Sequence, residues 1–430
     1  MRVRVILSLL TIIISLSSAR AQDVSYSAIY RVDGKSTTED TYRSHVNLES
    51  LDNNESAVLA VNGARLILTS VRVNKTGGVV SSQELRELYG VNSAVLATGG
   101  SNVLVETPTV NVHASYADGV TSHGSGTSVT VQGGLVNVTR EISTALRAVG
   151  GGHLSAEKVS VTTLGNQCPA VSASQSGSKA VVKGLKGGTN GVSSPLFHVS
   201  GELTAYDCLM ESGASQISTV EGSGSLTLEG CELRGGNYCG FLVYSSDARK
   251  DQGEALISLT GCKLTTKGGP FIYATNTEFR IRMEKNSISN GSRTFLCAQK
   301  DDWGDEGENG ARVTIDAVKQ TLDGDVIIDG ISSVRINLGK GSSLNGSVNS
   351  ENNPGAEARL YISKGARWNP RDISYITSLE FEEPIAKGIK CIKSKKDVFY
   401  DADDPVNSKL EGKQFKLSGG GMLRPLVEKQ

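Results

Sequence analysis

The sequence has no strong excess of charge of either sign. Its 430 residues include 44 basic and 45 acidic side chains, which give a formal net charge of −1. Loss of Arg2, Arg4 and Arg20 with a predicted N-terminal signal would lower the basic count from 44 to 41. Such a balance lacks the cationic surplus that nucleic acids and anionic lipids attract. We therefore expect neither of them to be a partner.

Long apolar runs are missing beyond the N-terminus. Residues 1–21 combine Arg2 and Arg4 with an apolar run over 5–16 and a small-x-small site at 19–21, a pattern typical of a secretory signal peptide. The run is too short to cross a bilayer, and no second run of this kind follows it. We therefore expect no membrane span and a secreted or cell-surface location.

Catalytic spacings are missing too. A Gly-x-Ser-x-Gly elbow would need a strand–turn–helix context, which the chain lacks. The glycine-rich segment 150–152 precedes an expected strand rather than a helix, so it does not form a phosphate cradle. The histidines lie far apart, without HxH or HExxH spacing: His45, His113, His123, His153 and His198. We assign no catalytic residue.

Helical periodicity is nearly absent, and a short β repeat takes its place. In 225–233, apolar residues at relative positions 0, 2, 5 and 7 predict two short half-buried strands joined by a bend. An apolar tetrad lies upstream of most copies, as at 57–60 and 241–244, and adds a third strand. Position 0 of the copies falls at Leu66, Val103, Val129, Leu154, Ala180, Leu203, Leu226, Ile257, Phe279 and Val313.

Such a unit can bury its inward side chains only against the next copy, so the copies must stack. Three strands in about 25 residues, with no helix between them, make one coil of a parallel β-helix. We therefore predict an all-β protein, a single-stranded right-handed parallel β-helix of roughly ten to twelve coils from about Ala57 to Ile362. The predicted parts are a signal peptide at 1–21, an N-terminal cap at 22–56, the β-helix at 57–380 and a C-terminal cap at 381–430.

Five segments carry a resemblance to a known group of proteins. They are 89–98 (YGVNSAVLAT), 119–127 (GVTSHGSGT), 320–333 (QTLDGDVIIDGISS), 373–379 (ISYITSL) and 414–421 (QFKLSGGG). The chain resembles the secreted, adhesin-like right-handed β-helix proteins of bacteria, which have a pectin-lyase-like fold. The resemblance covers almost all of the sequence after the signal and implies the fold and an exported protein. Most members of the group have no known function, so it implies little chemistry.

Three of the seven cysteines occupy equivalent places in consecutive coils. Cys208, Cys231 and Cys262 fall at position 5, so we expect them to stack inward as a ladder of buried thiols. A disulfide between two neighbours is the alternative, because a rung spacing of about 4.8 Å lies within the permitted Cα separation. The remaining four show no metal-ligand spacing: Cys168, Cys239, Cys297 and Cys391.

Longer insertions interrupt the repeat at three places. Residues 82–89 can form one or two helical turns with Ser82 as N-cap, either as a lid over a binding site or as a packed insertion. The other two insertions, 245–254 and 300–310, leave the same corner of the coil two rungs apart, about 10 Å along the axis. Loops on a rigid scaffold are where binding sites usually lie.

The corner between these two loops is our candidate site. The second loop places acidic side chains around Trp303, and Arg280 and Arg282 point outward on the coil between the loops. An exposed Trp stacks on sugars and clustered carboxylates suit Ca²⁺, whereas a salt-bridged loop with Trp303 as its plug explains the same residues. The candidate ligand-binding residues are Trp303, Asp301, Asp302, Asp305, Arg280 and Arg282; Ca²⁺ would be held by Asp301, Asp302, Asp305 and Glu306.

These observations favour a non-catalytic exported protein that binds a polysaccharide, a cell-surface glycan or another surface. A polysaccharide lyase or glycoside hydrolase is the alternative, because β-helix folds include both. A glycosidase needs two carboxylates facing each other across the sugar, and a lyase needs a base that removes a proton beside an acidic Ca²⁺ cluster. A purely structural surface protein is the third possibility.

Overall fold

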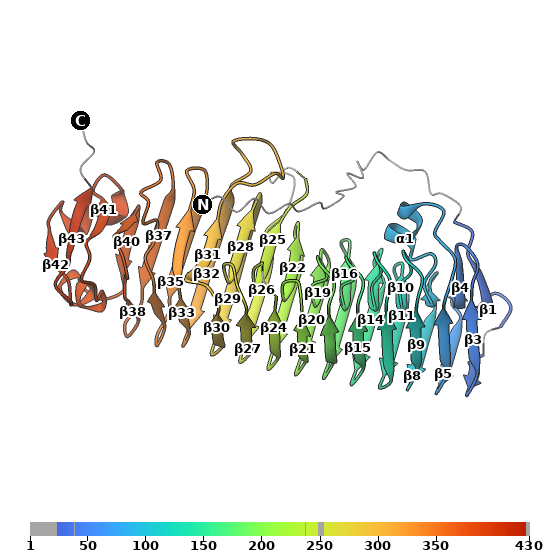
Figure 1. Ribbon diagram of the computed structural model, residues 1–430. Helices are drawn as coiled ribbons and strands as arrows, with labels where there is room; N and C mark the ends of the chain where they lie inside the picture. The colour runs from blue at the N-terminus through green and yellow to red at the C-terminus, as the bar shows by residue number, and fades with distance from the viewer. Residues whose placement is uncertain (1–23, 38, 237, 248–252, 427–430) are drawn as a thin grey trace.

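The computed structural model describes residues 24–37, 39–236, 238–247 and 253–426. They form a parallel β-solenoid of about 16 turns (Figure 1). The all-β fold class is confirmed, while the right-handed sense of the coil stays a prediction. The predicted signal peptide at 1–21 lies outside the described residues. Within these residues, no helix is long and apolar enough to cross a membrane.

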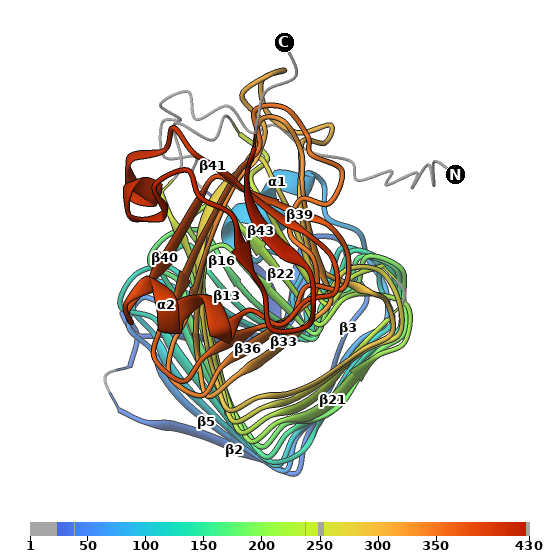
Figure 2. The same ribbon diagram turned by 90° about the vertical axis from the view of Figure 1, so that its left-hand side faces the viewer.

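Three long sheets run along the solenoid and enclose its core, as the end-on view shows (Figure 2). Sheet A contains β1 (Ser27–Asp33), β4 (Glu55–Val61), β7 (Val95–Ala97), β10 (Val120–His123), β13 (Leu146–Val149), β16 (Val171–Ser174), β19 (Phe197–Val199), β22 (Ser218–Glu221), β25 (Phe241–Tyr244), β28 (Ile272–Thr275), β31 (Thr294–Ala298) and β34 (Asp325–Ile328).

Sheet B contains β2 (Thr41–Ser44), β5 (Arg65–Thr69), β8 (Asn102–Glu106), β11 (Ser128–Gln132), β14 (His153–Glu157), β17 (Lys179–Lys183), β20 (Glu202–Tyr206), β23 (Ser225–Glu229), β26 (Ala255–Thr260), β29 (Thr277–Glu284), β32 (Ala311–Val318), β35 (Ser333–Leu338), β37 (Glu357–Ile362) and β40 (Ser378–Phe381). Sheet C contains β3 (Asn47–Ser50), β6 (Arg72–Lys75), β9 (Thr109–Val112), β12 (Leu135–Val138), β15 (Ser160–Thr163), β18 (Lys186–Thr189), β21 (Leu209–Ser212), β24 (Glu232–Gly235), β27 (Lys263–Thr266) and β30 (Ser287–Asn290).

The C-terminal turns use two shorter sheets. Sheet D contains β33 (Thr321–Asp323), β36 (Ser343–Asn345) and β38 (Arg367–Trp368); sheet E contains β39 (Ser374–Ile376), β41 (Val398–Asp401), β43 (Met422–Leu426) and β42 (Phe415–Lys416). The helical segments are α1 (Gln83–Tyr89), α2 (Ile385–Gly388) and the 3₁₀ turns η2 (Ile389–Cys391) and η3 (Pro405–Leu410). Antiparallel pairing of β42 with β43 ends the parallel stack.

The repeat read from the sequence is the register of sheet B. Leu203, Leu226 and Ile257 lie above one another on β20, β23 and β26, and alternate residues of these strands face the core. The last two predicted copies are displaced, because Phe279 pairs with Ala255 and the true equivalent of Ile257 is Ile281. Strands β29 and β32 are longer than the others, and a shift of two residues keeps the same face inward.

Twelve strands of sheet B lie between 57 and 362, which agrees with the predicted number of coils. The N-terminal segment predicted as a cap over 22–56 is itself a turn of the solenoid. Its strands β1, β2 and β3 pair in parallel with β4, β5 and β6, because the chain supplies one strand for each sheet there. The C-terminal segment likewise adds parallel strands before it closes the end.

The cysteine ladder lies at the corner between sheets B and C, facing inward. Cys208, Cys231 and Cys262 are each 1% exposed, and the backbone N–H of Cys208 donates to Cys231 Sγ at 3.4 Å. All seven cysteines are free thiols in the structure. The predicted stacking of these three residues is confirmed.

The inward orientation of alternate residues in sheet B can be tested at Leu228. This side chain is fully buried between Ala205 and Leu259 of the neighbouring turns. A Leu228→Asp substitution places a charge in the apolar stack and should cost several kcal/mol of unfolding free energy, or prevent folding. The control Thr227→Asp puts the same charge on the outward face of β23, between Thr204 and Ser258, and should cost about 0.5 kcal/mol or less. Urea unfolding followed by circular dichroism measures both; equal losses would contradict the inward assignment of Leu228.

Candidate functional site

The two predicted loops do leave the same corner, between sheets A and B. One follows β25 and the other follows β31, and Figure 1 shows the second rising above the solenoid; residues 248–252 of the first lie outside the described chain. Asn276 lies in the short connection between the two loops. Its side-chain amide donates to the carbonyl oxygens of Ser245 and Asp247 at 2.8 and 2.7 Å. The predicted placement of the loops is therefore confirmed.

Trp303 lies against the outward face of sheet A. Its ring packs on Tyr244 with a centroid separation of 4.6 Å and an interplanar angle of 36°. Leu242, Tyr273 and Cys297 complete the same apolar cluster. The side chain is half-buried, so Trp303 is a plug for this cluster, and only part of its ring remains open to a ligand.

The predicted contact between the acidic loop and the arginines does not form. Arg280 instead pairs with Glu254 at 3.5 Å and with Asp316 at 3.3 Å, while Asp301 accepts a hydrogen bond from the Tyr273 hydroxyl. The reason is directional: Arg280 and Arg282 project from sheet B, whereas the loop folds back over sheet A. The structure therefore separates the two halves of the predicted site.

The Ca²⁺ hypothesis receives no support from the geometry of the loop. Asp302 and Glu306 are both exposed. Among the residues that the structure describes, no three His, Cys, Asp or Glu side chains are placed to hold a metal ion.

Sheet A differs from sheets B and C because in its strands β13, β25 and β28 the outward residues are buried as well as the inward ones. Along this face one register line passes from β10 to β31. It carries Thr121, Arg147, Ser172, His198 and Thr219, and then Leu242, Tyr273 and Cys297. We call Arg147, Ser172, His198, Thr219 and the adjacent Glu221 the polar row. It ends at the cluster that Trp303 covers.

The polar row was missed in the sequence because the upstream tetrads read as apolar. Alignment of the segments 146–149, 171–174, 197–199 and 218–221 by turn would have shown a polar residue at the second position of each. The signal was therefore present, but it required the register between turns of unequal length.

Helix α1 packs across the N-terminal end of the polar row through a buried ion cluster. Asp118 is fully buried and accepts hydrogen bonds from Arg86 at 2.6 Å and from Arg147 at 2.9 Å. Arg147 also donates to the Glu87 carboxylate at 3.0 Å. Ser82 stands at the predicted N-cap position but makes no side-chain cap bond. The insertion is therefore held on sheet A by charge pairs rather than by its cap.

Two members of the polar row, His198 and Glu221, are partly open to solvent. The His198 side chain is 35% exposed, its Nε2 lies 3.5 Å from the Glu221 carboxylate, and Glu221 is 25% exposed. Hydroxyl groups beside them are fixed, since Ser172 and Ser174 share a 2.7 Å hydrogen bond and Gln216 donates to Thr219. Figure 1 shows that α1 and the long loop after β31 rise on either side of the short connections here.

Both carboxylates at this site are held in the ionised state. Burial opposes the charge on Glu87, but Arg86 and Arg147 lower its pKa to about 2. Burial likewise opposes the charge on Glu221, yet hydrogen bonds from His198, Ser246 and Tyr244 lower its pKa. A glycosidase requires one carboxylic acid whose pKa is raised, so that it is protonated when it acts. This pair does not meet that requirement.

His123 makes the folded protein sensitive to acid. Burial, with help from Arg147, lowers its pKa to about 4, whereas an unfolded histidine has a pKa near 6.5. The unfolded state therefore gains a proton first, and stability present above about pH 6.5 is lost as the pH falls toward 4, by up to about 3 kcal/mol. His123→Asn, which can keep the contact to the Thr98 hydroxyl at 2.7 Å, should flatten this slope.

Urea unfolding at intervals between pH 8 and 4 compares the two proteins. Carboxylates such as Glu87 lose their contribution below about pH 4.5 in both, so the difference between the curves isolates His123. Identical slopes above pH 4.5 would contradict the assignment.

Removal of Ca²⁺ with EDTA provides a separate test of whether the loop 300–310 binds Ca²⁺. Because Asp301 is bonded to Tyr273 and Arg280 to other acids, the melting temperature should be the same in EDTA and in millimolar CaCl₂. A Ca²⁺-dependent rise in melting temperature that Asp302→Ala removes would restore the Ca²⁺ hypothesis, since a ligand that binds only the folded state stabilises it.

Comparison with known proteins adds no relative to this description. No family model matches the chain, and neither a curated protein nor a solved structure matches it significantly. The likeness to adhesin-like β-helix proteins therefore rests on the sequence segments themselves, and the fold rests on the structure.

Proposed function

We propose that the protein is an exported, adhesin-like module that binds carbohydrate through the polar row and performs no catalysis. The observation that carries this proposal is the exposure of His198 and Glu221 between two raised elements, at 35% and 25% of their side-chain surface. Their neighbour Arg147 is only 2% exposed, so most of the surrounding sheet A face is closed. The exported location follows from residues 1–21 and is part of the proposal.

The chemistry of the polar row suits a sugar. Sugar hydroxyl groups both donate and accept hydrogen bonds, and planar carboxylate and imidazole groups can meet them in pairs. The row presents two such groups to solvent, His198 on β19 and Glu221 on the neighbouring strand β22. Aromatic rings provide the apolar faces on which sugar rings stack, and Tyr244 and Trp303 lie at the end of the row.

The ionised state of Glu87 and Glu221 favours binding over hydrolysis. Two anionic carboxylates can accept hydrogen bonds from a sugar, but neither can protonate a leaving group. The buried side chains of Ser172 and Thr219 flank His198 on the neighbouring strands, and a site that is ordered before a ligand arrives has a smaller entropic cost of binding.

Affinity electrophoresis in gels that contain single polysaccharides tests the proposal. On a polysaccharide that retards the protein, His198→Ala and Glu221→Gln should weaken binding about tenfold or more, since each lost contact of about 1.4 kcal/mol corresponds to a tenfold change. The control Lys179→Ala removes an exposed partner of Glu202 on sheet B and should leave retardation unchanged.

The remaining outcomes separate the alternatives. Release of reducing or unsaturated sugar ends, lost in Glu221→Gln, would establish an enzyme and overturn the non-catalytic proposal. Retardation by none of a broad panel would instead favour a purely structural protein. Melting curves of each variant distinguish lost binding from lost folding.

A further inference from the structure

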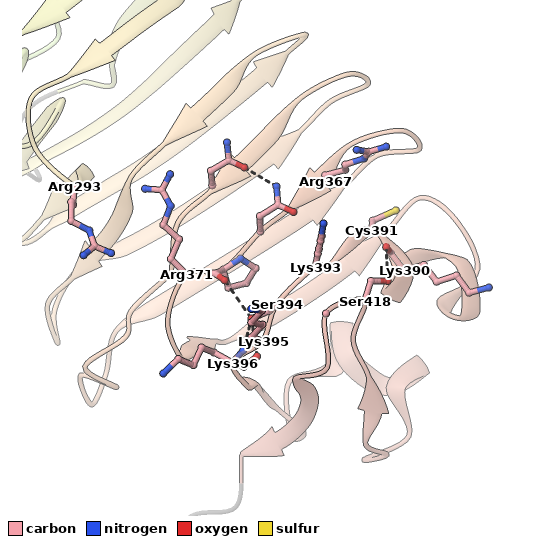
Figure 3. Close-up of a pocket in the computed structure, with 14 residues that line it drawn as sticks. Arg293, Arg367, Arg371, Lys390, Cys391, Lys393, Ser394, Lys395, Lys396 and Ser418 are labelled. Carbon is pink, nitrogen blue, oxygen red and sulfur yellow. Dashed lines mark hydrogen bonds between the residues drawn. The ribbon is translucent and has the colours of Figure 1, made fainter.

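A second surface, far along the chain from the polar row, gathers positive charge. A hollow of about 930 Å³ lies near the C-terminal end of the solenoid (Figure 3). Half of its 14 lining residues are cationic: Arg293, Arg367, Arg371 and four lysines between 390 and 396. No carboxylate of the described part of the chain lines it. We call this surface the cationic basin.

The stacking of the last turns explains why these residues meet. Sheet C ends at β30, and the short strands of sheet D continue that side of the coil. Leu344, Trp368 and Ile392 lie above one another facing the core, so the residues beside them, Arg367 and Lys393, project outward from successive turns. Figure 3 shows Arg371, Arg367 and Lys393 near one another at the hollow, with Arg293 on an earlier turn at its far side.

Most of this charge is not neutralised by the protein. Arg371 pairs with Asp323, and Lys396 lies 3.8 Å from Asp372. The other five cationic side chains form no ion pair with any residue that the structure describes. Arg293, Arg367 and Lys393 are all exposed. A chain with nearly equal numbers of basic and acidic residues thus concentrates unpaired cations at one place.

The rest of the lining indicates which anion fits. Asn369 donates to Asn345 at 2.7 Å, and with Ser418 these residues place neutral polar groups in the lining. Among the described residues, no aromatic side chain lines the basin, so the bases of a nucleic acid would find no ring there on which to stack. Cations on turns about 4.8 Å apart match repeated negative charges along a polymer better than one small anion.

We propose that the cationic basin binds an acidic polysaccharide that carries carboxylate or sulfate groups, at a site separate from the polar row. The proposal extends the carbohydrate binding proposed above to a second ligand class, and it stands on residues that the polar row does not share. Arg367 and Lys393 are the central contacts. Arginine meets a carboxylate or sulfate with two parallel N–H donors, and lysine adds a point charge.

Binding of polygalacturonate and dextran sulfate to immobilised full-length protein tests this, with neutral dextran as the comparison. Both acidic polymers should bind, and affinity should fall steeply as NaCl is raised from about 0.05 to 0.3 M because exposed charges are screened. The double variant Arg367→Ala/Lys393→Ala should weaken binding tenfold or more and reduce the salt dependence. The control double variant Lys179→Ala/Lys263→Ala also removes two exposed cations, which pair with Glu202 and Glu232, and should bind as the parent does.

Three results would overturn the proposal: equal loss in the control variant, equal binding of neutral dextran, or tighter binding of duplex or single-stranded DNA through the same residues. His198→Ala separates the two proposals. Acidic polymers should still bind this variant, and a neutral glycan retained by the polar row should still bind the basin variant.

Discussion

The parallel hydrogen-bonded register between turns is the constraint on which everything else in this structure depends. Each strand pairs with its equivalent in the next turn, so each side chain lies over its counterpart at a spacing of about 4.8 Å. Inward positions therefore become one continuous apolar core, in which Leu226 and Leu228 lie between neighbours of the same kind. Outward positions become lines whose chemistry is the sum of what successive turns contribute. The polar row is one such line.

In sheet A, helix α1 covers outward positions of the strands, and a charged side chain at such a position then needs a partner. An arginine at the equivalent of Ser172 becomes buried once α1 lies over it, and a buried charge is costly unless it is paired. Arg147 meets this requirement through Asp118 and Glu87, and Arg86 joins the same acids from the helix. The ion cluster both fixes α1 and holds Glu87 ionised at the edge of the row. The same ion cluster thus determines both where the helix lies and which charge the candidate site carries.

The sequence predicted the inward half of this architecture well and the outward half poorly. Inward residues repeat within a turn, so the 0, 2, 5, 7 spacing was sufficient to find sheet B, the strand corners and the stacked thiols of Cys208, Cys231 and Cys262. Outward neighbours come from different turns, and the length of a turn varies with its loops. Arg280 and Asp301 looked adjacent because their turns are adjacent, yet one projects from sheet B and the other folds over sheet A.

The same limitation applies to the basin. The basic segment 387–396 is visible in the sequence as a run of lysines, but Arg293 lies about a hundred residues earlier and Arg367 lies in another turn. Only the replacement of sheet C by sheet D, and the bridge from Trp368 to Ile392, bring them to one surface. A pattern within one segment cannot show which residues of other turns will lie beside it.

Charge pairing between turns gives a last reason to regard the basin as functional. Like charges stacked about 4.8 Å apart repel each other by about 1 kcal/mol even in water, so a stable solenoid should place opposite charges on neighbouring turns. Elsewhere this protein does so: Lys179 lies over Glu202 with a 2.8 Å contact, and Lys263 lies over Glu232 with a 2.9 Å contact. Arg335 over Arg359 on sheet B is an exception, and Arg359 there has Glu357 as a partner. At the basin several cations that form no ion pair with a described residue lie around one hollow. Unpaired charges of this kind are expected where a ligand supplies the missing partner, and the partner that we propose is an extended anion.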